Sequence, residues 1–178
     1  PIDKAVEIRA AGGASPIITQ GGSGDGIRLE ADDVTLRGIR VEQATHALDV
    51  PGAVNIQGLT VENCEFDDSN IGMYVANPDG DNTTFDDITV RNTSFNGNDR
   101  KGIYAERLSN ALFENIEVRN SGTEDSEPVP NGIDINLKYG DYSNITIQGS
   151  TFFESGIETS GAESFRSGEY YGALVVKA

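Results

Sequence analysis

The chain has 178 residues, and 29 acidic against 13 basic side chains give it a formal net charge of −16. A surface this acidic repels nucleic acid and anionic membranes, so we expect neither a nucleic-acid partner nor membrane insertion. The single cysteine, Cys64, cannot form an internal disulfide, and with His46 as the one histidine the sequence holds no Cys/His cluster for zinc. Cys64 is therefore expected to be a buried structural residue.

A short phrase, a small residue followed by a hydrophobic–polar–hydrophobic run, returns six times along the chain. The copies begin at Gly26, Ala47, Gly72, Gly102, Gly132 and Gly172. A second hydrophobic run follows most copies, and these companion runs begin at Ile39, Leu59, Ile88, Ile116 and Ile145. Short strands that repeat every roughly 20–40 residues, without helical periodicity, predict a solenoid.

Other short apolar segments complete the pattern in chain order. Residues 5–9 and 16–18 supply an opening coil, residues 34–36, 54–56 and 112–113 add a third strand, and residues 173–176 begin a new coil. We therefore predict one all-β domain over residues 1–178, with about six coils of three short strands each. Because the sequence starts at Pro1 without Met, we expect the domain to be a fragment of a longer chain.

Three asparagines follow strands at the same offset, in the segments Val-Glu-Asn63, Val-Arg-Asn92 and Val-Arg-Asn120. Asparagine tolerates a left-handed turn backbone, so a turn is expected at each of these positions. With this repeat and these asparagines, the sequence resembles the right-handed parallel β-helix superfamily of pectate lyases, polygalacturonases and alginate epimerases. The resemblance implies that the three asparagines form the ladder of stacked amides seen in that superfamily, with Asn92 largely buried. The resemblance covers nearly the whole chain from about Ala5 and implies a right-handed, single-stranded parallel β-helix.

Members of that superfamily usually carry an amphipathic helix over the N-terminal end of the coil. No helical periodicity precedes Gly26, and the chain stops inside a coil. Uncovered ends expose strand edges and apolar side chains, so we expect end-to-end self-association through uncapped coil ends.

One face of the coil collects polar side chains. If Ile27, Leu48, Met73, Ile103 and Ile133 point inward, their successors point outward, because side chains alternate along a strand. The first outward row is then Arg28, Asp49, Tyr74, Tyr104, Asp134 and Leu174, and the second includes Glu30, Pro51, Ala76, Glu106 and Asn136. Insertions at residues 76–84, 121–131 and 155–171 all border this strand column, which predicts that the functional face lies here.

The residues on this face suit a sugar ligand, because tyrosine rings pack against sugar CH groups while carboxylates and amides bind hydroxyls. The predicted substrate-binding residues are Tyr74, Tyr104, Asn136, Asp49, Arg28 and Arg107. The predicted catalytic residues are Asp134, Glu106, Lys138 and Tyr104. A lyase or epimerase would use Tyr104 or Lys138 to move a proton, whereas a hydrolase would use Asp134 and Glu106 as a carboxylate pair. His46 is interpreted as a surface residue of a turn.

The segment from Asn77 to Asn82 alternates Asp, Asn and Gly. Hard oxygen ligands around a glycine turn suit Ca²⁺, so Asp79 and Asp81 are candidate calcium ligands. A solvated turn without an ion is the alternative interpretation of the same residues.

Two hypotheses for the function follow. The first is an extracellular or cell-surface module that binds a polysaccharide on this face, either without processing it or as a lyase, epimerase or hydrolase. The second is a non-catalytic structural or adhesive segment of a secreted or surface protein, in which the β-helix acts as a spacer.

Overall fold

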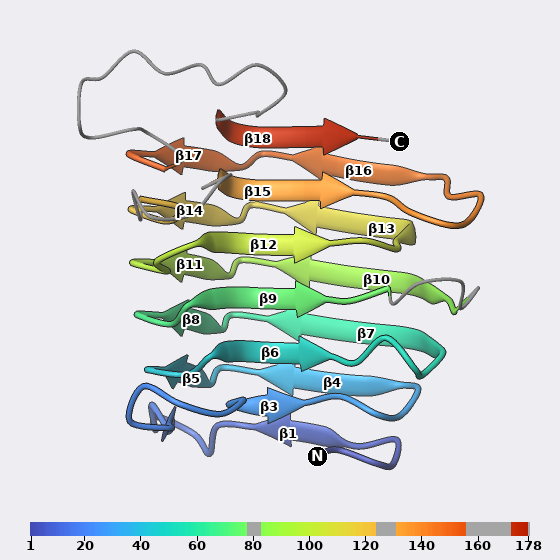
Figure 1. Ribbon diagram of the computed structural model, residues 1–178. Coiled ribbons are helices and arrows are strands. Elements are labelled where there is room, and N and C mark those ends of the chain that lie inside the picture. The colour runs from blue at the N-terminus through green and yellow to red at the C-terminus, as the bar shows by residue number, and fades with distance from the viewer. Residues whose placement is uncertain (78–82, 124–130, 156–171, 178) are drawn as a thin grey trace.

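The computed structural model describes residues 1–77, 83–123, 131–155 and 172–177. The chain forms a right-handed parallel β-helix of six coils, as the repeat and the resemblance predict. In Figure 1 the strands of the near side run left to right and those of the far side run back, while the chain climbs from the N-terminus to the C-terminus. No helix long and apolar enough to cross a membrane occurs among the described residues.

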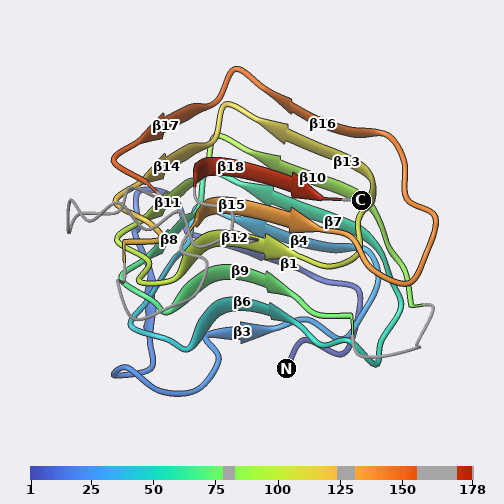
Figure 2. The same cartoon turned by 45° about the horizontal axis from the view of Figure 1, so that its top comes forward.

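Each coil contributes one strand to each of three parallel sheets, which form the three sides seen in Figure 2. Sheet 1 holds β3 (Ile27–Arg28), β6 (His46–Val50), β9 (Ile71–Val75), β12 (Lys101–Ala105), β15 (Asn131–Asn136) and β18 (Gly172–Lys177). Sheet 2 holds β1 (Glu7–Arg9), β4 (Val34–Arg37), β7 (Ile56–Glu62), β10 (Phe85–Arg91), β13 (Ser109–Glu114) and β16 (Ile145–Gln148). Sheet 3 holds β2 (Ile17–Thr19), β5 (Arg40–Glu42), β8 (Glu65–Asp67), β11 (Ser94–Asn96), β14 (Glu117–Arg119) and β17 (Thr151–Phe153).

Columns of apolar side chains fill the interior. The predicted column of Ile27, Leu48, Met73, Ile103 and Ile133 is confirmed, since these residues are register partners on neighbouring strands of sheet 1 and all are buried. Phe66 and Phe95 pack against each other from sheet 3, with ring centroids 5.4 Å apart. Cys64 is buried within the same core, as expected. Burial of each large apolar side chain stabilises the coil by about 1.5–3 kcal/mol.

The glycine of the repeated phrase is required by close packing between coils. A Cβ atom on Gly72 would lie 2.5 Å from the carbonyl oxygen of Gly102 and 2.8 Å from a ring carbon of Phe95. A Cβ atom on Gly102 would in turn approach a side-chain carbon of Val118 to 2.9 Å. Both Gly72 and Gly102 therefore face the interior. The residues after them, Met73 and Ile103, also face the interior, so the alternation of inward and outward side chains is interrupted at the start of these sheet 1 strands.

The asparagine ladder was predicted with the wrong third member. Asn63 and Asn92 follow β7 and β10 of sheet 2, whereas Asn120 follows β14 of sheet 3, because the run starting at Ile116 belongs to sheet 3. Asn115, which follows β13, continues the row. Asn63, Asn92 and Asn115 all adopt the predicted left-handed conformation, with φ of 54°, 49° and 52°.

The expected burial of Asn92 is also wrong, since its side chain is exposed. At this corner the flanking residues Val90 and Phe95 turn their side chains inward, and the asparagine amide projects to the outside, where Asn115 Nδ2 donates to Asn92 Oδ1 at 3.4 Å.

A buried polar ladder lies instead at the turn from sheet 3 to sheet 1. The backbone N–H of Ser69 donates to Oδ1 of Asn98 at 3.2 Å, Asn98 N–H donates to Ser121 Oγ at 3.3 Å, and Ser121 N–H donates to Ser155 Oγ at 3.3 Å. All four residues are buried. Each rung joins one coil to the next, so the ladder satisfies backbone groups that the turn would otherwise leave unpaired.

At the N-terminal end of the coil, Ile8 of β1 remains 36% exposed although its register partner Leu36 is buried, and Val6, just before β1, is 40% exposed. The predicted self-association through such ends stays a prediction.

Candidate functional site

The predicted outward row of sheet 1 is present on the folded chain. Arg28, Asp49, Tyr74, Tyr104 and Asp134 are register partners on β3, β6, β9, β12 and β15. The sixth predicted member is wrong by one residue, because Asp134 pairs with Val175 of β18 and Leu174 pairs with Ile133. We call the outer face of sheet 1, with the side chains that reach it from the strand ends, the sheet 1 strip.

A stack of three aromatic rings runs along the middle of the strip. The His46 and Tyr74 rings lie 4.3 Å apart with an interplanar angle of 9°, and the Tyr74 and Tyr104 rings lie 5.7 Å apart at 18°. Both faces of Tyr74 are therefore covered by protein. The expected flat platform for a sugar ring is not offered at this position, and the tyrosines present their edges and hydroxyl groups.

Glu106 is the centre of a hydrogen-bond network at the C-terminal half of the strip. Its Oε1 accepts from the Tyr104 hydroxyl at 2.6 Å and from the Lys138 ammonium, while Oε2 accepts from the backbone N–H of Asn77 at 2.7 Å. Asn136 Nδ2 reaches the Tyr104 hydroxyl at 3.5 Å. The structure thus brings together four of the predicted site residues, namely Tyr104, Glu106, Asn136 and Lys138.

This network fixes the protonation states of its members. Burial acts to raise the pKa of Glu106, but the hydrogen bonds from Lys138 and Tyr104 outweigh it and the pKa is lowered. Burial and the hydrogen bond to Glu106 raise the pKa of Tyr104 to about 12. Burial acts to lower the pKa of Lys138, but its bond to Glu106 prevails and raises it. Near neutral pH the network therefore holds a carboxylate, an ammonium group and a protonated phenol.

Asp134 does not join this network. Its Oδ2 lies 3.0 Å from Lys101 Nζ, both residues are buried, and Asp134 Oδ1 has no hydrogen-bond partner. Lys101 Nζ also lies 5.3 Å from the centroid of the Tyr104 ring. Alternation along β12 assigns Lys101 to the interior with Ile103, so the sequence analysis missed it. Gly102 could have indicated the position of Lys101. Because Gly102 and Ile103 both face the interior, alternation before Gly102 puts Lys101 on the outer side.

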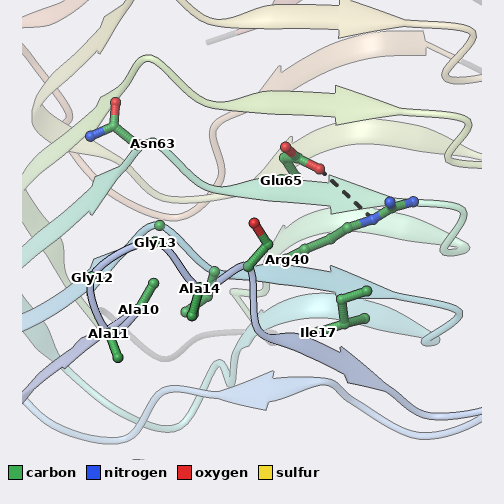
Figure 3. A pocket seen from close by; sticks show the side chains of 12 residues that line it. Ala10, Ala11, Gly12, Gly13, Ala14, Ile17, Arg40, Asn63 and Glu65 are labelled. Atoms are coloured by element: carbon green, nitrogen blue, oxygen red, sulfur yellow. Dashed lines mark ion pairs between the residues drawn. The ribbon is translucent and has the colours of Figure 1, made fainter.

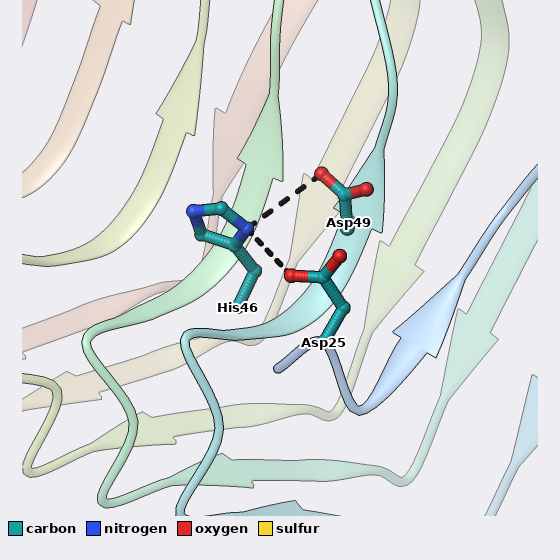
Figure 4. A group of neighbouring side chains, drawn as sticks. All are labelled: Asp25, His46 and Asp49. Carbon is teal, nitrogen blue, oxygen red and sulfur yellow. Dashed lines mark hydrogen bonds and ion pairs between the residues drawn. The ribbon is translucent and has the colours of Figure 1, made fainter. Parts of the chain in front are cut away.

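A second charged group lies at the N-terminal end of the strip (Figure 4). His46 Nδ1 is 2.9 Å from Asp25 Oδ1 and 3.7 Å from Asp49 Oδ1, and the ring nitrogen faces both carboxylates. Arg28 Nη1 lies 3.1 Å from Asp49 Oδ2 and 3.7 Å from Asp25 Oδ2. Burial, followed by the charge of Asp25, raises the pKa of Asp49. The interpretation of His46 as a surface residue of a turn missed this group.

Arg107 lies away from the strip, in contrast to its predicted place among the substrate-binding residues. Its side chain is fully buried, and the guanidinium donates to the carbonyl oxygens of Val54, Pro51 and Thr84 at 2.5, 2.8 and 3.1 Å. Burial lowers the pKa of Arg107. The residue therefore ties together the loops between sheets 1 and 2.

Asn77 and Tyr142 extend the Glu106 network in a way that the sequence did not indicate. Asn77 Nδ2 donates to the carbonyl oxygen of Lys138 at 2.6 Å and to the Tyr142 hydroxyl at 3.0 Å. These bonds hold the segment after β9 against the segment after β15. The proposed calcium ligands Asp79 and Asp81 lie outside the described residues, as do most of the insertions at 121–131 and 155–171.

The surface has other hollows, one of which lies where sheet 2 turns into sheet 3 (Figure 3). Small side chains and backbone from Ala10 to Ser15 form one wall. Arg40 and Glu65, which pair at 3.8 Å, are the charged residues of its lining. The sheet 1 strip holds a much denser set of polar groups, so we regard the strip as the better candidate site.

Comparison with known protein families identifies the architecture of the chain. The family model described as "Right handed beta helix region" matches residues 17–174. Neither a curated protein nor a solved structure matches the chain. The matched residues include strands of all three sheets, in agreement with the architecture described above.

Proposed function

We propose that this chain, which belongs to the right-handed β-helix family, binds a polysaccharide along the sheet 1 strip. The observation that carries the proposal is the network of Tyr104, Glu106, Asn136 and Lys138, in which charged and amide groups are held in place at a partly exposed surface. Groups of this kind bind sugar hydroxyls as hydrogen-bond donors and acceptors.

The geometry of the coil supports an elongated ligand. Successive coils repeat about every 4.8 Å, so polar groups recur along the axis at a regular spacing. Arg28 and Asp49 at one end of the strip and Lys138 at the other would then contact different units of one chain. Because both faces of the Tyr74 ring are covered, we propose that recognition there depends on hydroxyl contacts and on the ring edge rather than on stacking.

The protonation states support binding more than turnover at the Glu106 network. A lyase or epimerase base must accept a proton near its working pH. Tyr104 and Lys138 already carry theirs, and Glu106 has a lowered pKa and three donors. We therefore assign these residues to ligand binding, and place the protein outside the cell or at its surface, where structural polysaccharides occur.

A structural or adhesive spacer is the alternative, and one observation favours it. The charged side chains of the strip pair with one another, as Arg28 does with Asp49, Lys101 with Asp134, and Lys138 with Glu106. Pairs of this kind can simply keep a sheet face soluble.

A glycan array of neutral and acidic polysaccharides, screened with and without Ca²⁺, distinguishes the two functions. The parent should bind at least one polysaccharide, and Lys138→Met should weaken that binding at least tenfold. Thr60→Val, on the outer row of sheet 2, is the matched control and should bind as the parent does. Absence of binding to every polysaccharide under both conditions would leave the spacer function.

A further inference from the structure

Three potential metal-binding atoms converge at the N-terminal end of the strip. Nδ1 of His46 and one carboxylate oxygen each of Asp25 and Asp49 all lie within 4.8 Å of one another. A cation with ligand bonds of about 2.1 Å in tetrahedral geometry needs its ligand atoms about 3.4 Å apart. The distances of 2.9 and 3.7 Å from Nδ1 to the two Oδ1 atoms already bracket that value.

The surrounding side chains hold these atoms in position. Arg28 contacts Oδ2 of both Asp49 and Asp25, so the Oδ1 atom of each carboxylate is directed toward His46. The ring of Tyr74 packs almost parallel to the imidazole and fixes its plane. Outer contacts that orient the ligands in this way are a regular feature of protein metal sites.

The charge also suits a divalent cation. Two carboxylates face one guanidinium, which leaves the group with a net negative charge. Arg28 contacts the Oδ2 atoms of both carboxylates. The Oδ1 atoms face the imidazole and would bind the cation. A bound divalent cation would be the largest local charge in this group and would be attracted by both carboxylates.

We propose that Asp25, His46 and Asp49 bind a divalent transition-metal cation of the Zn²⁺ or Mn²⁺ class. A mixed set of one imidazole nitrogen and two carboxylate oxygens fits these ions, whereas Ca²⁺ prefers six to eight oxygen ligands. Three protein ligands leave at least one coordination position for water or a ligand hydroxyl. None of its three ligands belongs to the predicted calcium ligands, Asp79 and Asp81, and the proposal stands whether or not the strip binds a polysaccharide.

Isothermal titration calorimetry of the full chain with Zn²⁺, Mn²⁺ and Ca²⁺ tests the proposal. We expect one site for Zn²⁺ or Mn²⁺, weakened at least tenfold in His46→Gln and in Asp49→Asn. Glu30→Gln is the matched control, because Glu30 contacts Arg28 at 2.7 Å without belonging to the three ligands, and its affinity should stay within threefold of the parent. Metal binding that survives both ligand substitutions would overturn the proposal, as would no binding of either transition metal.

A second measurement avoids any folding defect in the variants. His46 is the one histidine of the chain, so its imidazole nitrogen resonances are unique. Zn²⁺ should shift the Nδ1 resonance of the unsubstituted protein, and Mn²⁺ should broaden the ring signals. Unchanged ring resonances at saturating metal would overturn the proposal.

Discussion

The imidazole of His46 lies flat against the ring of Tyr74, with centroids 4.3 Å apart and planes 9° apart. The two residues belong to adjacent coils, on β6 and β9. Their contact links the Asp25–His46–Asp49 group at one end of the strip to the Tyr104–Glu106 network at the other, through the second stacked pair of Tyr74 and Tyr104. The strip is therefore one continuous structure rather than two separate polar patches.

Tyr74→Ala should lower the free energy of unfolding by about 2–3 kcal/mol, because it removes a half-buried ring and both of its stacked contacts. Tyr74→Phe keeps the ring and should unfold like the parent in a urea titration. A loss of stability as large in Tyr74→Phe as in Tyr74→Ala would contradict the stacking account.

Glu106→Gln should move the pKa of Tyr104 down from about 12 toward the ordinary value of 10. The substitution removes the negative charge that opposes tyrosinate formation, while burial continues to raise the pKa. Tyrosinate absorbance, recorded as a difference titration between variant and parent, reports the shift. Glu30→Gln should leave that curve unchanged, and an unshifted curve in Glu106→Gln would show that Glu106 does not control Tyr104.

Asn98→Ala should destabilise the protein by about 2–4 kcal/mol, because it leaves the Ser69 N–H without its partner in the interior and removes the bond from Asn98 Nδ2 to the Phe66 carbonyl. Asn92→Gly changes an exposed asparagine whose φ of 49° glycine adopts freely, so its effect should stay within about 0.5 kcal/mol. Chemical denaturation of both variants compares the buried ladder with the exposed row. Equal effects at the two positions would argue against the buried ladder as the main support of the turns.

Asp67→Asn should become increasingly stabilising as the pH rises. Burial raises the pKa of Asp67 to about 6, although Arg40 lies 3.2 Å from its carboxylate and partly offsets the shift. Since the folded pKa exceeds the unfolded one, the native state holds the proton more tightly, and that stabilisation is present below about pH 4 and lost as the pH rises through about 6.

Between pH 4 and pH 8 the advantage of Asp67→Asn over the parent should therefore grow by up to about 3 kcal/mol. Thermal unfolding across this range measures it, with Glu117→Gln on the same sheet as the control. A constant difference between Asp67→Asn and the parent at all pH values would show that the carboxylate is not penalised by burial.

The spacing of apolar residues was sufficient to predict an all-β solenoid, and the resemblance to the right-handed β-helix superfamily specified its type. From the repeat around Ile103 and Ile133, the inward column, the sheet that contains it and the outward residues beside it were all predicted correctly. Period-two alternation in a solenoid leaves few alternative registers. The assignment failed where strand identity depended on a short segment. Ile88 and Ile116 begin similar hydrophobic runs, but the run at Ile88 belongs to β10 of sheet 2. In the coil of Ile116 the sheet 2 strand is the earlier segment β13, so the run that begins at Ile116 contributes β14 of sheet 3.

The candidate site was predicted only in part, and the reasons lie in local backbone geometry. Tyr104, Glu106, Asn136 and Lys138 follow simple alternation and were found together. Lys101 and His46 reach the strip from the starts of strands, where alternation is interrupted. A strict period-two pattern places Lys101 inside, whereas His46 was interpreted as a surface residue of a turn. The covered faces of the tyrosines depend on side-chain rotamers, which the sequence pattern does not specify.

Hydrogen–deuterium exchange with and without a polysaccharide selected from the array is the most direct test of the proposed binding face. The account predicts slower exchange in β9, β12 and β15 of sheet 1 when the polysaccharide is present, with exchange in β7, β10 and β13 of sheet 2 unchanged. Protection confined to sheet 2 or sheet 3, with sheet 1 unaffected, would contradict it.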